Sequence, residues 1–295
     1  MYITKKAPEK SGRKRKKMKK IISLVLALAL LCGCAFTLAS CGGKDTVVSK
    51  IGAQKGTTSK MYADILKGVE VVSYDTFALA AKDMKNGNVD YVIVDKTTGE
   101  ALCREISDLK INPIALSSEN YGIAIDKAQA NLKTQIDAIL AEKDAEIQAI
   151  KDKYMNNEKA SFVGVTPVAK DTAKADQQLV VATNAEFAPW EYKEGNQYFG
   201  IDMEIAALLA EELGMELVIE DMDFDNVVGS VGKLGIDIAM SGITITAERA
   251  DVVNFSTPYY TESIVIVHKA ADTSLASCGT VVDLLTVLCV ASEEE

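Results

Sequence analysis

Short apolar runs alternate with amphipathic stretches along residues 50–155. Brief apolar runs bounded by turn residues are typical of strands, and apolar positions every three to four residues are typical of helices. Strands are predicted at 50–54, 69–72, 91–94, 111–115 and 121–125. Helices are predicted at 57–67, 76–85, 99–106 and 131–155, the last as one long helix or a pair. This half of the chain therefore predicts an α/β lobe.

The second half repeats this pattern after a polar, Ala/Lys/Asp-rich stretch at 156–178, which indicates a linker. Strands are predicted at 179–182, 216–219 and 236–240, and helices at 201–213 and 224–233. In each half one buried strand ends in a polar residue, Asp95 or Ser241. Ligands of α/β proteins bind at the carboxyl ends of strands, so we expect a ligand in the crevice between two lobes.

The N-terminus has the pattern of an export signal. A basic stretch at 13–20 precedes an apolar run at 21–31, which is too short to span a bilayer comfortably. The following Leu-Ala-Ser-Cys run resembles a bacterial lipobox, which implies cleavage after residue 40 and a lipid on Cys41. We therefore expect a tether at 41–49 and a lipid-anchored protein on the extracytoplasmic face of the membrane. An uncleaved anchor helix is the alternative.

Charge and composition exclude several classes of function. The 295 residues carry a net charge of −10, and residues 41–295 alone carry 22 Lys+Arg against 41 Asp+Glu. Nucleic-acid binding is not expected of so acidic a body. A single histidine, His268, argues against Ser-His-Asp or Cys-His catalysis and multi-His metal sites. The six cysteines form no zinc-type pair in the body, so we expect no metal and no cofactor.

Several motifs together resemble one family. The most specific are Ser241–Arg249 and Phe255–Tyr260, and Asn184–Tyr192 precedes them. Gln54–Ser59 and Glu119–Ala124 match in the first half. These segments resemble the extracellular solute-binding proteins of amino-acid ABC transporters, family 3. That resemblance implies an α/β, two-lobed, periplasmic-binding-protein-like clamshell.

The order of the halves is exchanged relative to that family, so the resemblance implies a circularly permuted clamshell. The expected parts are a signal peptide at 1–40, the tether at 41–49, lobe 2 at 50–125, helices at 126–155 that pack on lobe 1, the linker at 156–178, lobe 1 at 179–270 and an irregular tail at 271–295. The new chain ends, near 46 and 270, are expected close to the hinge. A fusion of tandem genes, or a non-functional remnant of them, is the alternative.

The resemblance also implies a ligand site. It assigns the ligand carboxylate to Thr58, Thr244 and Arg249, and the ammonium to Asp95. Arginine suits the first role because its planar guanidinium grips a carboxylate with two hydrogen bonds. Plainer roles remain open, since Thr58 and Asp95 could merely cap helices and Arg249 could lie on the surface. The candidate ligand-binding residues are Thr58, Ser59, Asp95, Asn184, Phe187, Trp190, Phe224, Gly242, Thr244 and Arg249.

The resulting expectation is a lipid-anchored receptor, and a monomer, that delivers a free amino acid to the membrane subunits of an ABC permease. It is not expected to be an enzyme. A cleft enzyme on the same fold would need an acid/base pair, and Glu186 is the only extra carboxylate near the predicted loop. A sensor or adhesion module is a further alternative.

Overall fold

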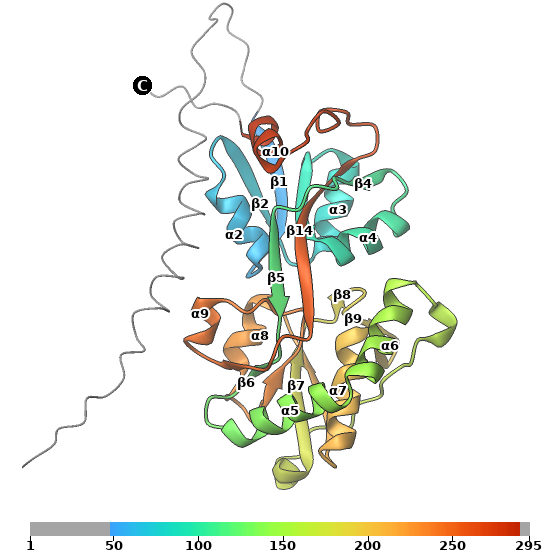
Figure 1. Cartoon of the computed structure of the whole chain (residues 1–295), viewed down its shortest axis with the longest axis vertical. Helices are drawn as coiled ribbons and strands as arrows, with labels where there is room; N and C mark the ends of the chain where they lie inside the picture. The colour runs from blue at the N-terminus through green and yellow to red at the C-terminus, as the bar shows by residue number, and fades with distance from the viewer. Residues whose placement is uncertain (1–47, 290–295) are drawn as a thin grey trace, which may run out of the picture. The chain divides into compact units, whose positions relative to one another are not determined.

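The computed structural model describes residues 48–289, which fold as two α/β lobes (Figure 1). The expectations for the signal, the lipobox, Cys41 and the tether up to residue 47 lie outside the described residues. No helix within 48–289 is long and apolar enough to cross a bilayer.

Lobe A, residues 48–121 and 260–289, contains a six-stranded sheet in the order β2-β1-β3-β14-β4, with β5 paired to β14. The strands are β1 (Ser49–Gln54), β2 (Val69–Tyr74), β3 (Tyr91–Asp95), β4 (Leu109–Ile111), β5 (Ser117–Tyr121) and β14 (Tyr260–Lys269). The helices are α2 (Thr58–Ile65), α3 (Phe77–Asn86), α4 (Lys96–Glu105) and α10 (Val281–Leu288). β1, β2 and β3 are parallel, as the alternation of strands and helices requires, and β14 is antiparallel to β3.

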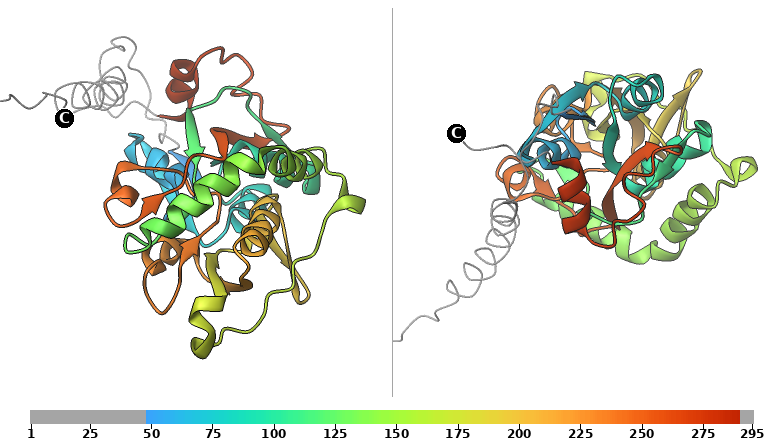
Figure 2. Two further views of the ribbon diagram at one scale, coloured as in Figure 1. Left: turned by 60° about the horizontal axis from the view of Figure 1, so that its bottom comes forward. Right: turned by 90° about the horizontal axis from the view of Figure 1, so that it is seen from above.

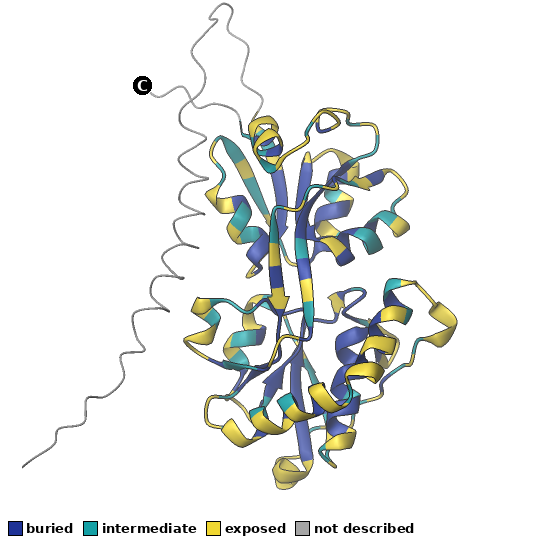
Figure 3. Ribbon diagram, in the orientation of Figure 1, coloured by how far each residue is buried: buried dark blue, intermediate teal, exposed yellow. Residues whose placement is uncertain are grey.

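Lobe B, residues 122–259, contains a five-stranded sheet in the order β11-β7-β12-β6-β13 and a smaller sheet of β8, β9 and β10. The strands are β6 (Ala124–Ile125), β7 (Gln178–Thr183), β8 (Glu186–Phe187), β9 (Glu191–Glu194), β10 (Gln197–Phe199), β11 (Glu216–Asp221), β12 (Ile238–Ala239) and β13 (Asn254–Phe255). The helices are α5 (Ala130–Glu142), α6 (Asp144–Met155), α7 (Ile201–Glu212), α8 (Phe224–Ser230) and α9 (Ala247–Ala250), with short 3₁₀ turns at Lys159–Ser161 and Thr172–Gln177. In both lobes the core strands are buried and the helices expose their outer faces (Figure 3).

Local sequence explains where the helices of lobe A begin and end. Thr57 and Thr76 are the N-caps of α2 and α3, and each side chain accepts a hydrogen bond from a backbone N–H of the first turn. α3 ends at Gly87, whose φ of 85° is left-handed and suits glycine. These caps fix the helix starts next to the strand ends that face the other lobe.

The chain crosses between the lobes twice, once between β5 and β6 and once between β13 and β14. The crossings lie side by side, because the backbone N–H of Tyr259 donates to the carbonyl of Tyr121 at 3.1 Å. Gly122 N–H donates to the carbonyl of Ile243 at 3.0 Å, which ties the first crossing to lobe B. The expected two-lobed α/β clamshell is confirmed, with this pair of crossings as its hinge.

One strand belongs to a different lobe from the one expected. Residues 260–269 were assigned to the lobe of 179–270, but β14 pairs with β3, β4 and β5 in lobe A. Ile264–Val267 is apolar throughout, so it is stable only inside a sheet covered on both faces. The single strand expected at 121–125 is split into β5 and β6, because the chain leaves one sheet there and enters the other.

The predicted helical pair packs on lobe B. α6 and α5 contact α7 (Figure 2). Tyr154 donates its hydroxyl proton to Glu204 at 2.6 Å. The buried stripe of this pair contains the apolar positions expected from the periodicity, from Leu132 to Tyr154.

The tail differs from the expectation of an irregular segment. α10 begins with a capping box, in which Thr280 and Asp283 each accept a hydrogen bond from the other's backbone N–H. Leu284 and Leu288 are fully buried on the lobe A core with Leu275. The capping residues determine where α10 begins, and burial of the two leucines determines where it packs on lobe A.

The placement of the chain ends also differs from the expectation. Register places Ile51 of β1 and His268 of β14 level with Tyr91, whereas Ile264 is level with Asp95. The end of β14 and the start of β1 therefore lie together at the far end of lobe A. The site near 270 is remote from the hinge, and residue 46 is outside the described range.

Candidate functional site

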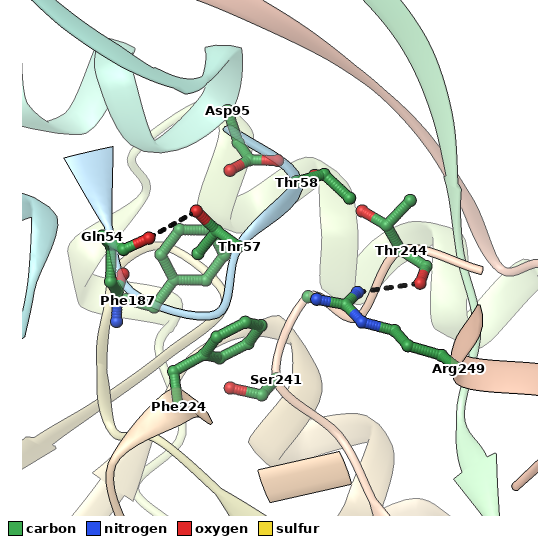
Figure 4. A pocket seen from close by; sticks show the side chains of 10 residues that line it. Gln54, Thr57, Thr58, Asp95, Phe187, Phe224, Ser241, Thr244 and Arg249 are labelled. Carbon is green, nitrogen blue, oxygen red and sulfur yellow. Dashed lines mark hydrogen bonds between the residues drawn. The ribbon is translucent and has the colours of Figure 1, made fainter. Parts of the chain in front are cut away.

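A cleft between the lobes gathers the polar ends of several strands (Figure 4). Lobe A contributes Gln54, Thr57, Thr58 and Asp95. Lobe B contributes Phe187, Phe224, Ser241, Gly242, Thr244 and Arg249. The empty space among them is about 270 Å³, part of it open to solvent.

Arg249 supplies the cation of the cleft. Its Nη1 donates to the carbonyl of Thr244 at 2.8 Å, and its Nη2 donates across the cleft to the carbonyl of Gly56 at 2.9 Å. The guanidinium carbon lies 5.6 Å from the centre of the Phe224 ring. Within residues 48–289 no carboxylate lies within 4.0 Å of Arg249, so its charge has no ion-pair partner. The arginine faces the cleft and can bind an anion there.

Burial lowers the pKa of Arg249 from its ordinary value, while the nearby Glu119 and Asp95 carboxylates raise it. An arginine nevertheless stays charged, because its ordinary pKa is far above neutral. A half-buried cation with no ion-pair partner gains more from an anionic ligand than a fully exposed cation does.

Asp95 supplies an acid on the opposite wall. It ends β3, is 5% exposed, and accepts a hydrogen bond from the Tyr121 hydroxyl at 2.6 Å. It precedes α4 but makes no side-chain capping bond, so capping does not explain it. Figure 4 shows its carboxyl group directed at the cleft. Burial raises the pKa of Asp95 to about 8, with further increases from Glu262 and Glu119.

The two threonines meet at a carboxylate that sequence reasoning did not assign to the site. The Thr58 and Thr244 hydroxyls each donate to Oε2 of Glu119 at 2.7 Å. Glu119 lies on β5 and is 8% exposed. Glu119 and Tyr121 share one face of this strand because side chains alternate. This alternation could have predicted Glu119 from the sequence, because Tyr121 belongs to the family-like motif Glu119–Ala124.

The aromatic candidates Phe187 and Phe224 line the cleft from lobe B. The Phe187 ring also contacts Phe77 of lobe A, with ring centres 5.7 Å apart. Gly242 has a φ of 52°, and a Cβ there would lie 2.6 Å from the Phe187 ring. Glycine is therefore required at this turn for both conformation and space.

Three candidates do not line the cleft. Ser59 is fully buried in lobe A, and its Oγ has no hydrogen-bond partner among the described residues. Asn184 accepts a hydrogen bond from Gln54 Nε2 at 3.1 Å and so joins the two lobes. Trp190 is fully buried beside the hinge, where its indole N–H donates to Thr97 Oγ1 at 2.8 Å. These three buried side chains therefore contribute to the interior of lobe A and to contacts between the lobes.

Conversely, Gln54, Thr57 and Ser241 line the cleft without having been predicted to do so. Each adjoins a candidate or a predicted strand end, so the signal was present in the motifs. Glu186, the extra carboxylate considered from sequence, is exposed and does not line the cleft.

A buried acidic pair supports the turn at Ser241–Gly242 from below. Asp202 accepts hydrogen bonds from Gly242 N–H and the Tyr259 hydroxyl, both at 2.8 Å. Glu191 accepts one from Ser241 at 2.6 Å. Burial raises the pKa of Asp202 to about 7 and that of Glu191 well above its ordinary value. This network holds the turn that carries Thr244.

Residues 179–284 match the family described as bacterial extracellular solute-binding proteins, family 3. This segment belongs to that family. The arginine-binding extracellular protein ArtP of Bacillus subtilis (strain 168) is 40% identical over 93 residues, which are 32% of this chain and 36% of ArtP. The cyclohexadienyl dehydratase of Pseudomonas aeruginosa is 40% identical over 82 residues, 28% of this chain and 31% of that enzyme.

A crystal structure of the arginine-bound form of domain 1 from TmArgBP is 35% identical, with a TM-score of 0.29. The match covers 41% of this chain and 98% of that one. The chain spans only about a third of the length of the curated relatives it matches. The resemblance to amino-acid solute-binding proteins is confirmed for the family 3 segment.

The family 3 segment holds only part of the cleft. Phe187, Phe224, Thr244 and Arg249 lie within 179–284, but the opposite wall, with Thr58 and Asp95, lies outside it. The folded structure supplies that wall from an earlier part of the chain.

Proposed function

We propose that this protein binds a free amino acid in the cleft between its lobes. The observation that carries the proposal is the placement of Arg249 and Asp95 on opposite walls of one small cleft. An amino acid carries a carboxylate and an ammonium group, which need these two charges once water is removed. A ligand that contacts both walls stabilises closure, because it gains both contacts only when the lobes meet.

The balance of charge favours a ligand with a cationic side chain. Asp95 and Glu119 place two acidic groups near a single guanidinium. The relative ArtP is named as an arginine-binding protein. L-arginine is therefore the first ligand to test.

The proposal includes delivery to an ABC permease by a monomer anchored through a lipid on Cys41. It is supported by the export and lipobox pattern and by the naming of the relatives. It also includes exchange of the lobes by circular permutation, supported by the packing of α5 and α6 on α7. In this arrangement residues 156–178 join helices and sheet within lobe B.

A thermal-shift screen against the common amino acids, followed by calorimetry, tests the proposal. The chain from residue 44 to its end is used, because α10 buries two leucines on lobe A. A ligand at a hundred times its Kd adds about 2.7 kcal/mol of stability. Arginine and lysine should produce the largest shifts. Absence of a shift with every amino acid would refute the proposal.

A cleft enzyme is the second candidate, and one observation favours testing it. Burial raises the pKa of Asp95 to about 8, so this acid can hold a proton at neutral pH. A cyclohexadienyl dehydratase is among the relatives of this chain. Mass spectrometry of the ligand after long incubation separates the two, since a binding protein returns it unchanged.

A further inference from the structure

Glu119 fills the place where the proposed ligand needs hydrogen-bond donors. Its Oε2 accepts from Thr58 of lobe A and from Thr244 of lobe B, at 2.7 Å each. A threonine hydroxyl has one proton to donate. While Glu119 holds both protons, neither threonine can donate to a ligand carboxylate.

Arg249 is not blocked in the same way. A guanidinium has five N–H donors, and the two hydrogen bonds that Arg249 donates among the described residues, to the carbonyls of Thr244 and Gly56, leave other N–H groups free. A ligand carboxylate can therefore approach the cation but meets a second carboxylate beside the hydroxyls. Two carboxylates that bind side by side repel each other strongly where water is excluded.

The other oxygen of the Glu119 carboxylate has a partner on its own strand. The Ser117 hydroxyl donates to Oε1 at 3.4 Å, and this bond can retain the carboxylate after Oε2 leaves the threonines. Rotation of the glutamate would release both hydroxyls and remove the repulsion. The bond to Thr244 also crosses from lobe A to lobe B, so the same rotation would break one link that holds the ligand-free lobes together.

We propose that Glu119 is a specificity-determining residue that occupies the ligand-carboxylate position and is displaced when an amino acid binds. This rests on the proposed function of the cleft. The state with Glu119 in place cannot accept a ligand carboxylate at the two hydroxyls, so its population weakens the apparent affinity for an amino acid in proportion. Ligands whose carboxylate cannot displace it are rejected.

The test compares L-arginine with agmatine, its decarboxylated analogue, by calorimetry on the purified full chain. Glu119→Gln keeps the size of the side chain and removes the charge. The ratio of the agmatine Kd to the arginine Kd should rise at least about fivefold, because only arginine competes for the hydroxyls. Glu119→Ala should change the ratio in the same direction. Glu248→Gln is the matched control, since it removes a charge from an exposed residue next to Arg249.

An unchanged or lower ratio in both Glu119 variants would overturn the proposal, because Glu119 would then be a contact or a structural group. If the wild type binds no amino acid, the proposed function fails. Small-angle X-ray scattering without added ligand then tests whether Glu119 holds the two lobes together. Glu119→Gln should then be less compact than wild type and the Glu248 control equally compact. Equal compactness of all three would also overturn it.

Discussion

Asp95 should make amino-acid binding depend on pH. Burial raises its pKa to about 8, so most molecules keep this acid protonated at pH 7. An ammonium ion placed against this acid favours the ionised form. Binding must then release a proton.

The size of the effect follows from the same pKa. Each pH unit below the pKa of Asp95 adds about 1.4 kcal/mol to the free-energy cost of ionising it. The apparent Kd should therefore fall about tenfold per pH unit between pH 6 and pH 8 and then level off. The free energy of unfolding depends on pH in the opposite direction. Asp95 keeps its proton in the native state up to about pH 8, whereas in the unfolded chain it releases the proton near pH 4. The free energy of unfolding that Asp95 contributes is therefore lost as the pH rises from about 4 towards 8.

Calorimetry of L-arginine binding from pH 6 to 8.5, in two buffers of different ionisation enthalpy, measures both the affinity and the protons released. Wild type should release nearly one proton at pH 7. Asp95→Asn should bind more weakly at pH 8 and show no dependence on pH. A flat affinity in wild type, with no proton released, would refute the reasoning about Asp95.

The remaining predictions concern the guanidinium, the tail and the anchor. Arg249→Ala should cost on the order of 2–5 kcal/mol of binding by calorimetry, with the exposed Arg104→Ala as a neutral control; equal affinities would remove Arg249 from the site. Leu284→Ala should lower the free energy of unfolding in urea by about 2–5 kcal/mol, whereas Val282→Ala, 55% exposed, should change it by less than about 0.5; matching losses would mean that α10 is not docked. Cys41→Ser should abolish labelling by radioactive fatty acid and release the protein from membranes, and normal labelling would place the lipid elsewhere.

Local pattern in the sequence was enough for most of the central strands and long helices and for part of the site. Thr57 and Thr76 cap helices because their hydroxyls satisfy N–H groups a few residues away, which needs no tertiary contact. Thr244 and Arg249, which were predicted from the motif Ser241–Arg249, both line the cleft from the same lobe. Both inferences depend on residues close together in the chain.

Only the tertiary structure decided which distant residues meet. The apolar run of β14 is compatible with either sheet, and its pairing with β3 is settled by long-range hydrogen bonds. Trp190 and Asn184 carry the motif of a ligand loop but face the hinge and the other lobe. The raised pKa of Asp95 arises from its burial, and the position of Glu119 between two threonines arises from contact between the lobes. Burial and cross-lobe contact depend on the whole fold, so no pattern within one segment could specify them.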